Sequence, residues 1–245
     1  MEEELTAIVQ AYAKSESPRP QVMVGFNRRF APMISQMKLF LQEISEPLAL
    51  TYRVNAGHLP PDHWMNDPEH GGGRILGEAC HFVDLLMFLA ESRIVEVAGA
   101  SLGNSARYSG ANALFSLRFA NGSQGTISYL ANGDRSFSKE RIEVFGGGST
   151  AVLEDFRRLE LVRNGRKQVI RARWRQDKGH MAEWAAFVSA IQSNTAPPIP
   201  LDEIIHSTMA TLCVQKSLAT GARVTVNPLP LDVELTSTLS LTQSR

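Results

Sequence analysis

The sequence has few cysteines, no excess of charge of either sign and no long apolar run. Its 245 residues include only two cysteines, Cys80 and Cys213, whose separation matches neither a disulfide framework nor a zinc site. Lysine plus arginine and aspartate plus glutamate number 25 each, so no net field gathers nucleic acid or a membrane surface. The longest apolar run, Phe82 to Ala90, is interrupted by Asp84 and is too short to cross a bilayer.

The N-terminus lacks the features of an export signal. It opens with Glu2, Glu3 and Glu4, and no apolar core of a signal peptide follows them. With 43% hydrophobic and 20% charged residues, the composition is that of an ordinary globular protein that can bury a core. We therefore expect a cytoplasmic protein that binds neither nucleic acid nor a membrane.

The glycines do not form a nucleotide-binding loop. Gly71, Gly73 and Gly77 follow a loop instead of a buried strand, and their spacing misses G-x-G-x-x-G by one residue. The glycines at 146–148 lie between two expected strands, so we predict a turn of a sheet there. The motif G-x-x-x-x-G-K-[ST] is also absent from the sequence. The sequence therefore offers no loop of its own for the phosphates of a nucleotide.

The pattern of apolar residues predicts an α+β domain. Hydrophobic residues recur at helical spacing in some segments and form short compact runs in others. The expected helices are 3–14, 32–44, 76–90, 180–193 and 202–220, and the expected strands are 22–26, 48–54, 115–119, 126–129, 159–162 and 169–172. Asn121-Gly122 and Asn164-Gly165 each separate two of these strands and favour tight hairpin turns. The predicted fold is a large, mainly antiparallel sheet with helices on one face.

The expected helix at 76–90 combines an apolar surface with three ionisable side chains. Glu78, His81 and Asp84 are spaced three residues apart, which makes them neighbours on one side of the helix. A helix that is apolar almost all round is mostly buried, so these groups are expected to line a partly buried cleft. A neighbouring carboxylate raises the pKa of an imidazole and orients its ring, as a general base requires. The alternative is that both carboxylates only satisfy a structural histidine.

Two other polar segments are weaker candidates for a site. Residues 157–178 contain nine basic residues and two acidic ones, a pattern typical of solvated hairpin strands as well as of phosphate contacts. The segment has no interleaved aromatic ladder of the kind that binds single-stranded nucleic acid. His58, His63 and His70 follow no recognised metal-ligand spacing, so no metal site is expected.

Several segments resemble the Gfo/Idh/MocA family of oxidoreductases. VMVGFNRRFAP at 22–32 is similar to the strand that enters the second domain of these enzymes, and HWMNDPEHGGGRILGEACHFVD at 63–84 looks like their Gly-Gly-Gly and histidine segment. KERIEVFGGGSTAVLEDF at 139–156 and KGHMAEWAAFVSAI at 178–191 resemble a later sheet and helix. The resemblance covers about residues 1–226 and looks closest to a fused or two-domain subgroup of surface-polysaccharide pathways.

The resemblance implies a two-lobed enzyme that acts on sugars, inositols or related polyols. A Rossmann lobe binds NAD or NADP, and the second lobe supplies the substrate pocket and often a dimer interface. Hydride passes between nicotinamide and a sugar carbon, while a histidine and the lysine of a Glu-Lys-Pro motif assist the proton transfer. On this pattern, residues 1–21 are expected to be the last helix of a Rossmann lobe, 22–226 the substrate domain and 227–245 a loose tail.

The family pattern assigns the acid/base role to His81. Many members carry an aspartate four residues before this histidine, but the present sequence has Gly77 there. We expect Glu78 to replace that carboxylate as a second catalytic residue. Either Glu78 or Asp84 would orient the imidazole ring.

Substrate and cofactor contacts are expected on both sides of this helix. Arg28 would fix an anionic or hydroxyl-rich substrate, Trp64 would stack on a sugar face, and Asp84 would complete the substrate site. Asn27 and Arg28 would lie where the entering strand meets the nicotinamide, so both are expected to contact the cofactor.

The leading hypothesis is the C-terminal domain of an NAD(P)-dependent oxidoreductase that acts on a sugar, sugar-nucleotide or polyol. Because the glycine loop and the Glu-Lys-Pro lysine are missing, we expect this chain alone to bind NAD or NADP weakly. The expected partners are a sugar-like small molecule and either further copies of the chain or a Rossmann lobe. Two alternatives remain: a non-catalytic sugar-binding or oligomerisation module that keeps the fold, and a metal hydrolase, which would require bound metal.

Overall fold

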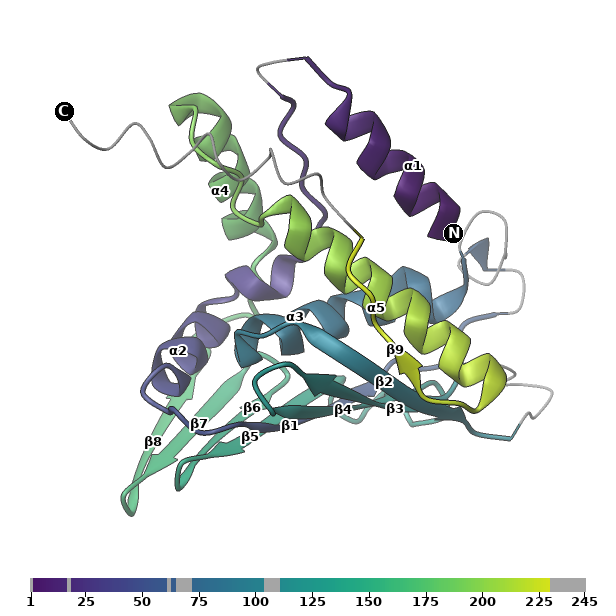
Figure 1. The fold of residues 1–245 in the computed structure, drawn as a ribbon. Coiled ribbons are helices and arrows are strands. Elements are labelled where there is room, and N and C mark those ends of the chain that lie inside the picture. The colour runs from purple at the N-terminus through teal and green to yellow at the C-terminus, as the bar shows by residue number, and fades with distance from the viewer. Residues whose placement is uncertain (1, 17–18, 61–62, 65–71, 104–110, 230–245) are drawn as a thin grey trace.

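The computed structural model describes residues 2–16, 19–60, 63–64, 72–103 and 111–229. Within these residues a nine-stranded sheet forms one layer, and the helices lie over one of its two faces (Figure 1). This arrangement confirms the predicted α+β fold with helices gathered on one side. No helix of the described residues is long and apolar enough to span a bilayer.

The described elements alternate between helices and strands. The helical segments are α1 (Glu2–Ala13), the 3₁₀ turn η1 (Asn27–Phe30), α2 (Pro32–Leu41), the π-helical turn η3 (Ile75–Ala79), α3 (Cys80–Ala90), α4 (His180–Ser193) and α5 (Leu201–Thr220). The strands are β1 (Ala49–Asn55), β2 (Ile94–Ser101), β3 (Ala113–Phe119), β4 (Gln124–Leu130), β5 (Glu140–Gly146), β6 (Ser149–Glu154), β7 (Arg158–Arg163), β8 (Arg166–Arg171) and β9 (Val224–Thr225).

The sheet is mainly antiparallel, as predicted. Its strand order is β8-β7-β6-β5-β1-β4-β3-β2-β9, and among these strands only β1 and β4 pair in parallel. The predicted hairpins join β3 to β4 and β7 to β8. Asn164 and Gly165 both adopt positive φ, as a tight hairpin turn of this kind requires. Gly147 and Gly148 also have positive φ and turn the chain from β5 to β6, so the predicted sheet turn is confirmed.

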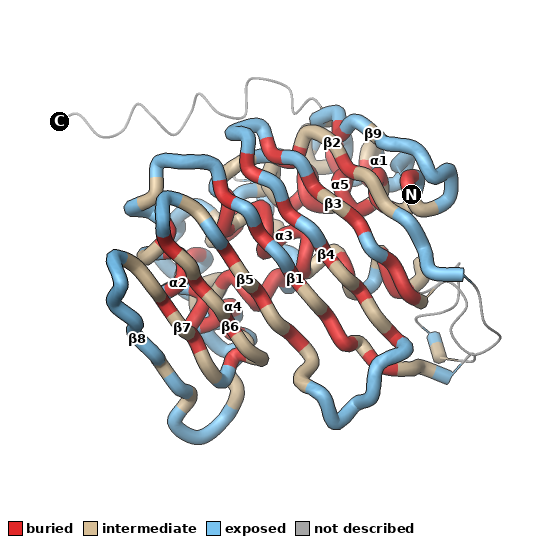
Figure 2. The backbone as a smooth tube through the Cα atoms, turned by 90° about the horizontal axis from the view of Figure 1, so that it is seen from below, coloured by how far each residue is buried: buried red, intermediate tan, exposed pale blue. Residues whose placement is uncertain are grey.

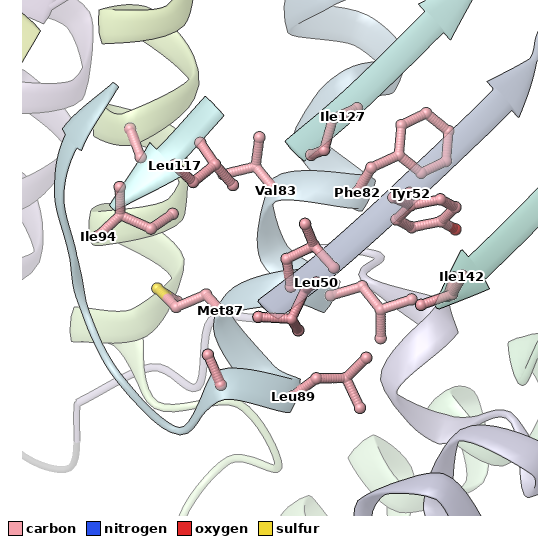
Figure 3. Packing of buried hydrophobic residues seen from close by; sticks show 14 of the residues in the cluster. Leu50, Tyr52, Phe82, Val83, Met87, Leu89, Ile94, Leu117, Ile127 and Ile142 are labelled. Atoms are coloured by element: carbon pink, nitrogen blue, oxygen red, sulfur yellow. The ribbon is translucent and has the colours of Figure 1, made fainter. Parts of the chain in front are cut away.

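The core lies between the sheet and the helices. Residues of β5 and β6 alternate between buried and partly exposed, as expected for a sheet with one covered face. Helix α3 is buried over most of its surface and packs Phe82, Val83 and Leu89 into the cluster shown in Figure 3. The opposite face of the sheet has no covering layer within the described residues, and Figure 2 shows exposed and half-buried residues along it.

The predicted strand at 22–26 is not a strand in the structure. No described residue pairs with it, and of its side chains only Phe26 is buried, while Val24 is 39% exposed. A β-strand is stable only when its backbone groups find partners in a sheet, so an apolar run without a neighbouring strand stays irregular. The sequence pattern also missed β2, which joins the sheet between β3 and β9.

The N-terminal helix α1 packs against the core. Leu5 and Val9 of α1 are buried in the main hydrophobic cluster, and α1 packs against α5. Of the tail expected to be loose, residues 227–229 are described and 230–245 lie outside the described residues.

Candidate functional site

Five strands end together at one end of the sheet, beside the candidate site. The register of five strands brings together residues at the ends of β1, β5, β6, β7 and β8, namely Val54, Glu140, Glu154, Arg158 and Arg171. The connections 131–139 and 172–179 leave the sheet at this end (Figure 2). Helix α4 begins directly after the second connection, next to the turn η1.

The turn η1 is fastened to the start of α4. The side-chain amide of Asn27 donates a hydrogen bond to the carbonyl oxygen of Lys178 over 2.7 Å. Gly179 has a φ of +88°, and a Cβ there would lie 2.5 Å from the backbone nitrogen of Ala31 and closer still to the carbonyl oxygen of Asn27. Only glycine fits this close approach. Two segments 151 residues apart in the sequence are therefore held in one arrangement.

Arg28 is held by a buried carboxylate, Glu140. Its Nε and Nη2 atoms lie 2.9 and 3.0 Å from the two carboxylate oxygens, and the Lys178 ammonium lies 2.6 Å from one of them. The hydroxyl of Tyr52 donates to the same carboxylate. Burial alone would raise the pKa of Glu140, but Arg28 and Lys178 outweigh it and hold this pKa at about 2. Glu140 is therefore charged at neutral pH and has no exposed surface.

Glu78 is the centre of a second cluster. It accepts hydrogen bonds from the Lys139 ammonium at 2.7 Å, from Arg74 at 3.4 Å and from the hydroxyl of Tyr129. Burial opposes ionisation, but the contacts with Lys139, Tyr129 and Arg74 lower the pKa of Glu78 below its ordinary value. Glu78 belongs to the π-helical turn η3, in a segment where a regular α-helix was predicted. Glu78 is thus an ionised acceptor whose oxygens are already engaged.

His81 lies between these two clusters. Its ring is half-buried and meets the Phe26 ring edge-on at a centroid distance of 5.8 Å. Its Nδ1 atom is buried and has no hydrogen-bond partner among the described residues. Glu78 and Glu140 both raise the pKa of His81, but burial and the nearby Arg28 lower it further, to about 4.

The neighbouring carboxylates act on His81 in the expected direction, but burial and Arg28 outweigh them, so the expected raised pKa of the imidazole is not found. Desolvation disfavours the imidazolium, and the carboxylates are already matched by cations. His81 is consequently neutral at physiological pH.

Asp84 pairs with Arg29. The guanidinium of Arg29 binds both carboxylate oxygens, at 2.6 and 2.7 Å, and Asp84 is 1% exposed. Burial raises the pKa of Asp84 to about 6 in spite of this pairing. Among the described contacts, no hydrogen bond links His81 to either Glu78 or Asp84. The predicted substrate role of Asp84 stays a prediction.

The remaining predicted residues lie in different surroundings. Trp64 is 61% exposed, and its ring lies 5.9 Å from that of His63. Asn27 and Arg28 are buried, and their polar groups bind other side chains and backbone of this domain. Their expected contacts with substrate and cofactor stay predictions. Among the described residues, no group of three or more histidine, cysteine, aspartate or glutamate side chains could hold a metal ion.

The sequence analysis missed the residues that complete both clusters. Glu140 and Lys139 fell within segments noted only for their general resemblance to a family, and Lys178 was noted only within such a segment and as one of the nine basic residues of 157–178. One signal was available in the sequence. Glu140 lies two residues before Ile142 on the same strand, so its side chain points to the same face of the sheet, toward the core. A charged residue at a core-facing strand position needs a partner, which marks it as structurally or functionally special.

Comparison with known proteins supports the family resemblance. Residues 41–152 match the model of the GFO/IDH/MocA C-terminal domain. Levoglucosan dehydrogenase in complex with NADH and levoglucosan is 17% identical with a TM-score of 0.76, covering 93% of this chain and 71% of that one. An NAD binding oxidoreductase from Klebsiella pneumoniae is also 17% identical, with a TM-score of 0.77 and coverage of 92% and 70%.

A third similar structure is an oxidoreductase domain protein from Kribbella flavida. It is 19% identical with a TM-score of 0.75, covering 92% of this chain and 71% of that one. At these identities the likeness shows a shared fold. No curated protein matches the sequence.

Proposed function

This chain carries the C-terminal domain of the Gfo/Idh/MocA family, and on that premise we propose that it binds the substrate of an NAD(P)-dependent oxidoreductase. The substrate would be a sugar, sugar-nucleotide or polyol whose hydroxyl-bearing carbon gives up a hydride. His81 would take the proton of that hydroxyl, and Glu78 would fix the surroundings of its ring. The sheet end that holds both residues would form the floor of the substrate pocket.

The state of His81 is the observation that carries this proposal. Oxidation of an alcohol to a carbonyl removes a hydride from carbon and a proton from oxygen, so a neutral base must stand beside the hydroxyl. With a pKa of about 4, His81 is such a base at neutral pH. Its buried Nδ1 also lacks a partner among the described residues. An unpaired buried nitrogen costs about 1–3 kcal/mol, so the ring is not placed there to make a structural hydrogen bond through Nδ1.

The described residues do not by themselves make a dinucleotide site. Asn27 and Arg28 are already engaged with Lys178 and Glu140, and the described part of the chain holds no glycine loop between a strand and a helix N-terminus. The nicotinamide nucleotide, which would supply the hydride acceptor, must therefore be held by a further lobe.

Exposed apolar groups next to the site support such a lobe. Val24 precedes the turn η1, and Met181 and Trp184 project from the first turns of α4 with exposures of 39%, 79% and 62%. Contiguous exposed apolar residues usually mark an interface. We expect a nucleotide-binding lobe to cover this surface, and further copies of the chain to cover the open face of the sheet.

The decisive experiment joins this chain to a nucleotide-binding lobe encoded upstream in frame or by a neighbouring gene. Reduction of NAD⁺ or NADP⁺ would be followed by absorbance with a panel of sugars, sugar-nucleotides and polyols. Turnover with at least one of them is expected. If a correctly folded pair binds a sugar but transfers no hydride, the chain is a non-catalytic sugar-binding module and the proposal fails.

A further inference from the structure

We infer that the ligand of this site carries an anionic group, a phosphate or a carboxylate attached to the sugar, which the ammonium groups of Lys139 and Lys178 bind. The inference rests on the proposed function, because it takes the surroundings of His81 as the substrate pocket. It narrows that proposal to one class of substrate.

The first support is the balance of charge around His81. Two carboxylates, Glu78 and Glu140, lie close enough to act on the imidazole. Glu78 pairs with Lys139 and Arg74, and Glu140 pairs with Arg28 and Lys178. Four cations therefore face two carboxylates, which leaves two positive charges without a matching negative group. Because buried or half-buried charge is costly unless it is paired, this surplus favours an anionic ligand.

The second support is the difference in access among the four cations. The guanidinium groups of Arg28 and Arg74 are buried, with 9% and 4% of their side chains exposed. The side chains of Lys139 and Lys178 are 40% and 17% exposed. The arginines thus hold the carboxylates in place, while the two ammonium groups can reach a ligand.

Each of these ammonium groups has donors left over. An ammonium group has three N–H donors. Among the described residues, Lys139 makes one hydrogen bond, to Glu78, and Lys178 makes one, to Glu140. The remaining donors can bind oxygen atoms of a phosphate or carboxylate without breaking either existing ion pair.

The third support lies at the same end of the sheet, at the last residue of β8 and on the connection that follows it. Arg171, Arg173 and Arg175 are exposed, and none of them forms an ion pair within the described part of the chain. The exposed Trp174 lies among them. The whole chain has a net charge of zero, so this positive rim is a local feature. A group of charges of one sign steers ligands of the opposite sign toward the end of the sheet that carries it.

The inference is tested by calorimetric titration of the intact chain with glucose, glucuronate, glucose 6-phosphate and inorganic phosphate. We expect glucuronate or glucose 6-phosphate to bind at least roughly tenfold more tightly than glucose, with an affinity that falls as salt is added. Whichever of the two binds more tightly identifies the anion as a carboxylate or a phosphate. Inorganic phosphate alone is expected to bind more weakly than the sugar derivative.

Substitutions test whether the anionic group binds to the ammonium groups of Lys139 and Lys178. Lys139→Met should weaken the binding of the anionic sugar by roughly tenfold more than it weakens the binding of glucose, and Lys178→Met should do the same. Lys167→Met is the matched control, because Lys167 is an exposed lysine of β8 paired with Glu160. Since Lys139 lies largely at the surface, its variant keeps the test valid even if Lys178→Met unfolds.

Several results would overturn the inference. The inference fails if glucose and the anionic sugars bind with equal affinity, or if no anionic sugar binds. It also fails if inorganic phosphate binds more tightly than the sugar derivatives, or if Lys139→Met leaves the affinity for the anionic sugar unchanged. This titration measures binding in the absence of cofactor, so its result can be told apart from a failure of the proposed function. If an anionic sugar binds but is never oxidised, only the proposed function is contradicted. If neutral sugars are turned over and anionic sugars do not bind, only this inference is contradicted.

Discussion

Gly179 packs so closely against the turn that contains Asn27 that no other residue fits beside it. Its φ of +88°, and the 2.5 Å that would separate an added Cβ from the Ala31 nitrogen, together exclude a side chain. This contact fixes the carbonyl oxygen of Lys178 on the Asn27 amide, and with it the position of the Lys178 ammonium beside Glu140. The geometry of the site thus depends on a glycine that takes no part in chemistry.

The first prediction compares two glycines with similar backbone strain and different space. Gly165 has a φ of +71° with no atom within 4 Å of an added Cβ, so Gly165→Ala should cost only about 1 kcal/mol. Gly179→Ala adds a backbone clash to that strain and should cost more than about 3 kcal/mol. Denaturant unfolding of both variants measures the difference. Equal costs would show that α4 and η1 can separate freely.

The second prediction concerns the buried pair of Arg28 and Glu140. Arg28→Met leaves a fully buried carboxylate with fewer partners, and it should lower the free energy of unfolding by about 3–5 kcal/mol. In the double variant Arg28→Met/Glu140→Gln the uncompensated charge is gone, so the loss should be smaller than in Arg28→Met alone. A double-mutant cycle by urea denaturation tests this. Additive losses would mean that the two side chains do not act as a pair.

The third prediction is the pH dependence of stability. The pKa of His81 is lowered on folding from 6.5 to about 4, and a histidine with a lowered pKa contributes stability above its unfolded pKa that is lost as the pH falls through the folded one. The contribution of His81 to the unfolding free energy should therefore decline between pH 6.5 and 4, and His81→Gln should remove that contribution from the slope. Asp84, whose pKa burial raises to about 6, acts in the opposite sense over part of the same range, so the comparison of His81→Gln with the unchanged chain carries the test. Glu140, with a folded pKa of about 2, extends the decline below pH 4.5.

The buried His206 also has a lowered pKa, because of its burial, and it titrates over part of the same range. His206→Gln is therefore the control that separates the contribution of His81. An unchanged slope in His81→Gln would contradict the burial of its imidazole.

The fourth prediction is that the chain self-associates through the uncovered face of the sheet. Leu114 and Phe145 are each 46% exposed, on strands in which every second residue is buried in the core. Light scattering should give a mass above that of a 27.0 kDa monomer, and Phe145→Lys should return it toward the monomer. Leu39→Lys serves as the control, because Leu39 is exposed on the helical side. A clean monomer at high concentration would refute this prediction.

The sequence was sufficient to predict most of the fold. The hairpins at Asn121-Gly122 and Asn164-Gly165 follow from local turn chemistry, and the burial of α3 follows from its nearly continuous apolar surface. The strand predicted at 22–26 failed, because strand formation depends on a partner that a local pattern does not reveal.

The site was predicted less completely, for a similar reason. His81 and Glu78 could be noticed because they lie within one turn of each other in the sequence. Most partners of the site residues come from distant strands and loops: Tyr129 is 51 residues from Glu78, and Glu140 is 112 residues from Arg28. Whether the net pKa of His81 is raised or lowered depends on burial and on distant cations such as Arg28, which oppose the two carboxylates. Neither can be read from spacing along one helix.

The most direct test of the central claim measures turnover and melting temperature of His81→Ala, in the chain joined to its nucleotide-binding lobe. Because the half-buried ring has no hydrogen bond on Nδ1 among the described residues, the melting temperature should change little, while kcat should fall by roughly 10²–10⁴-fold, as general acid–base catalysis requires. A His81→Ala enzyme that keeps full turnover and loses only thermal stability would contradict the account.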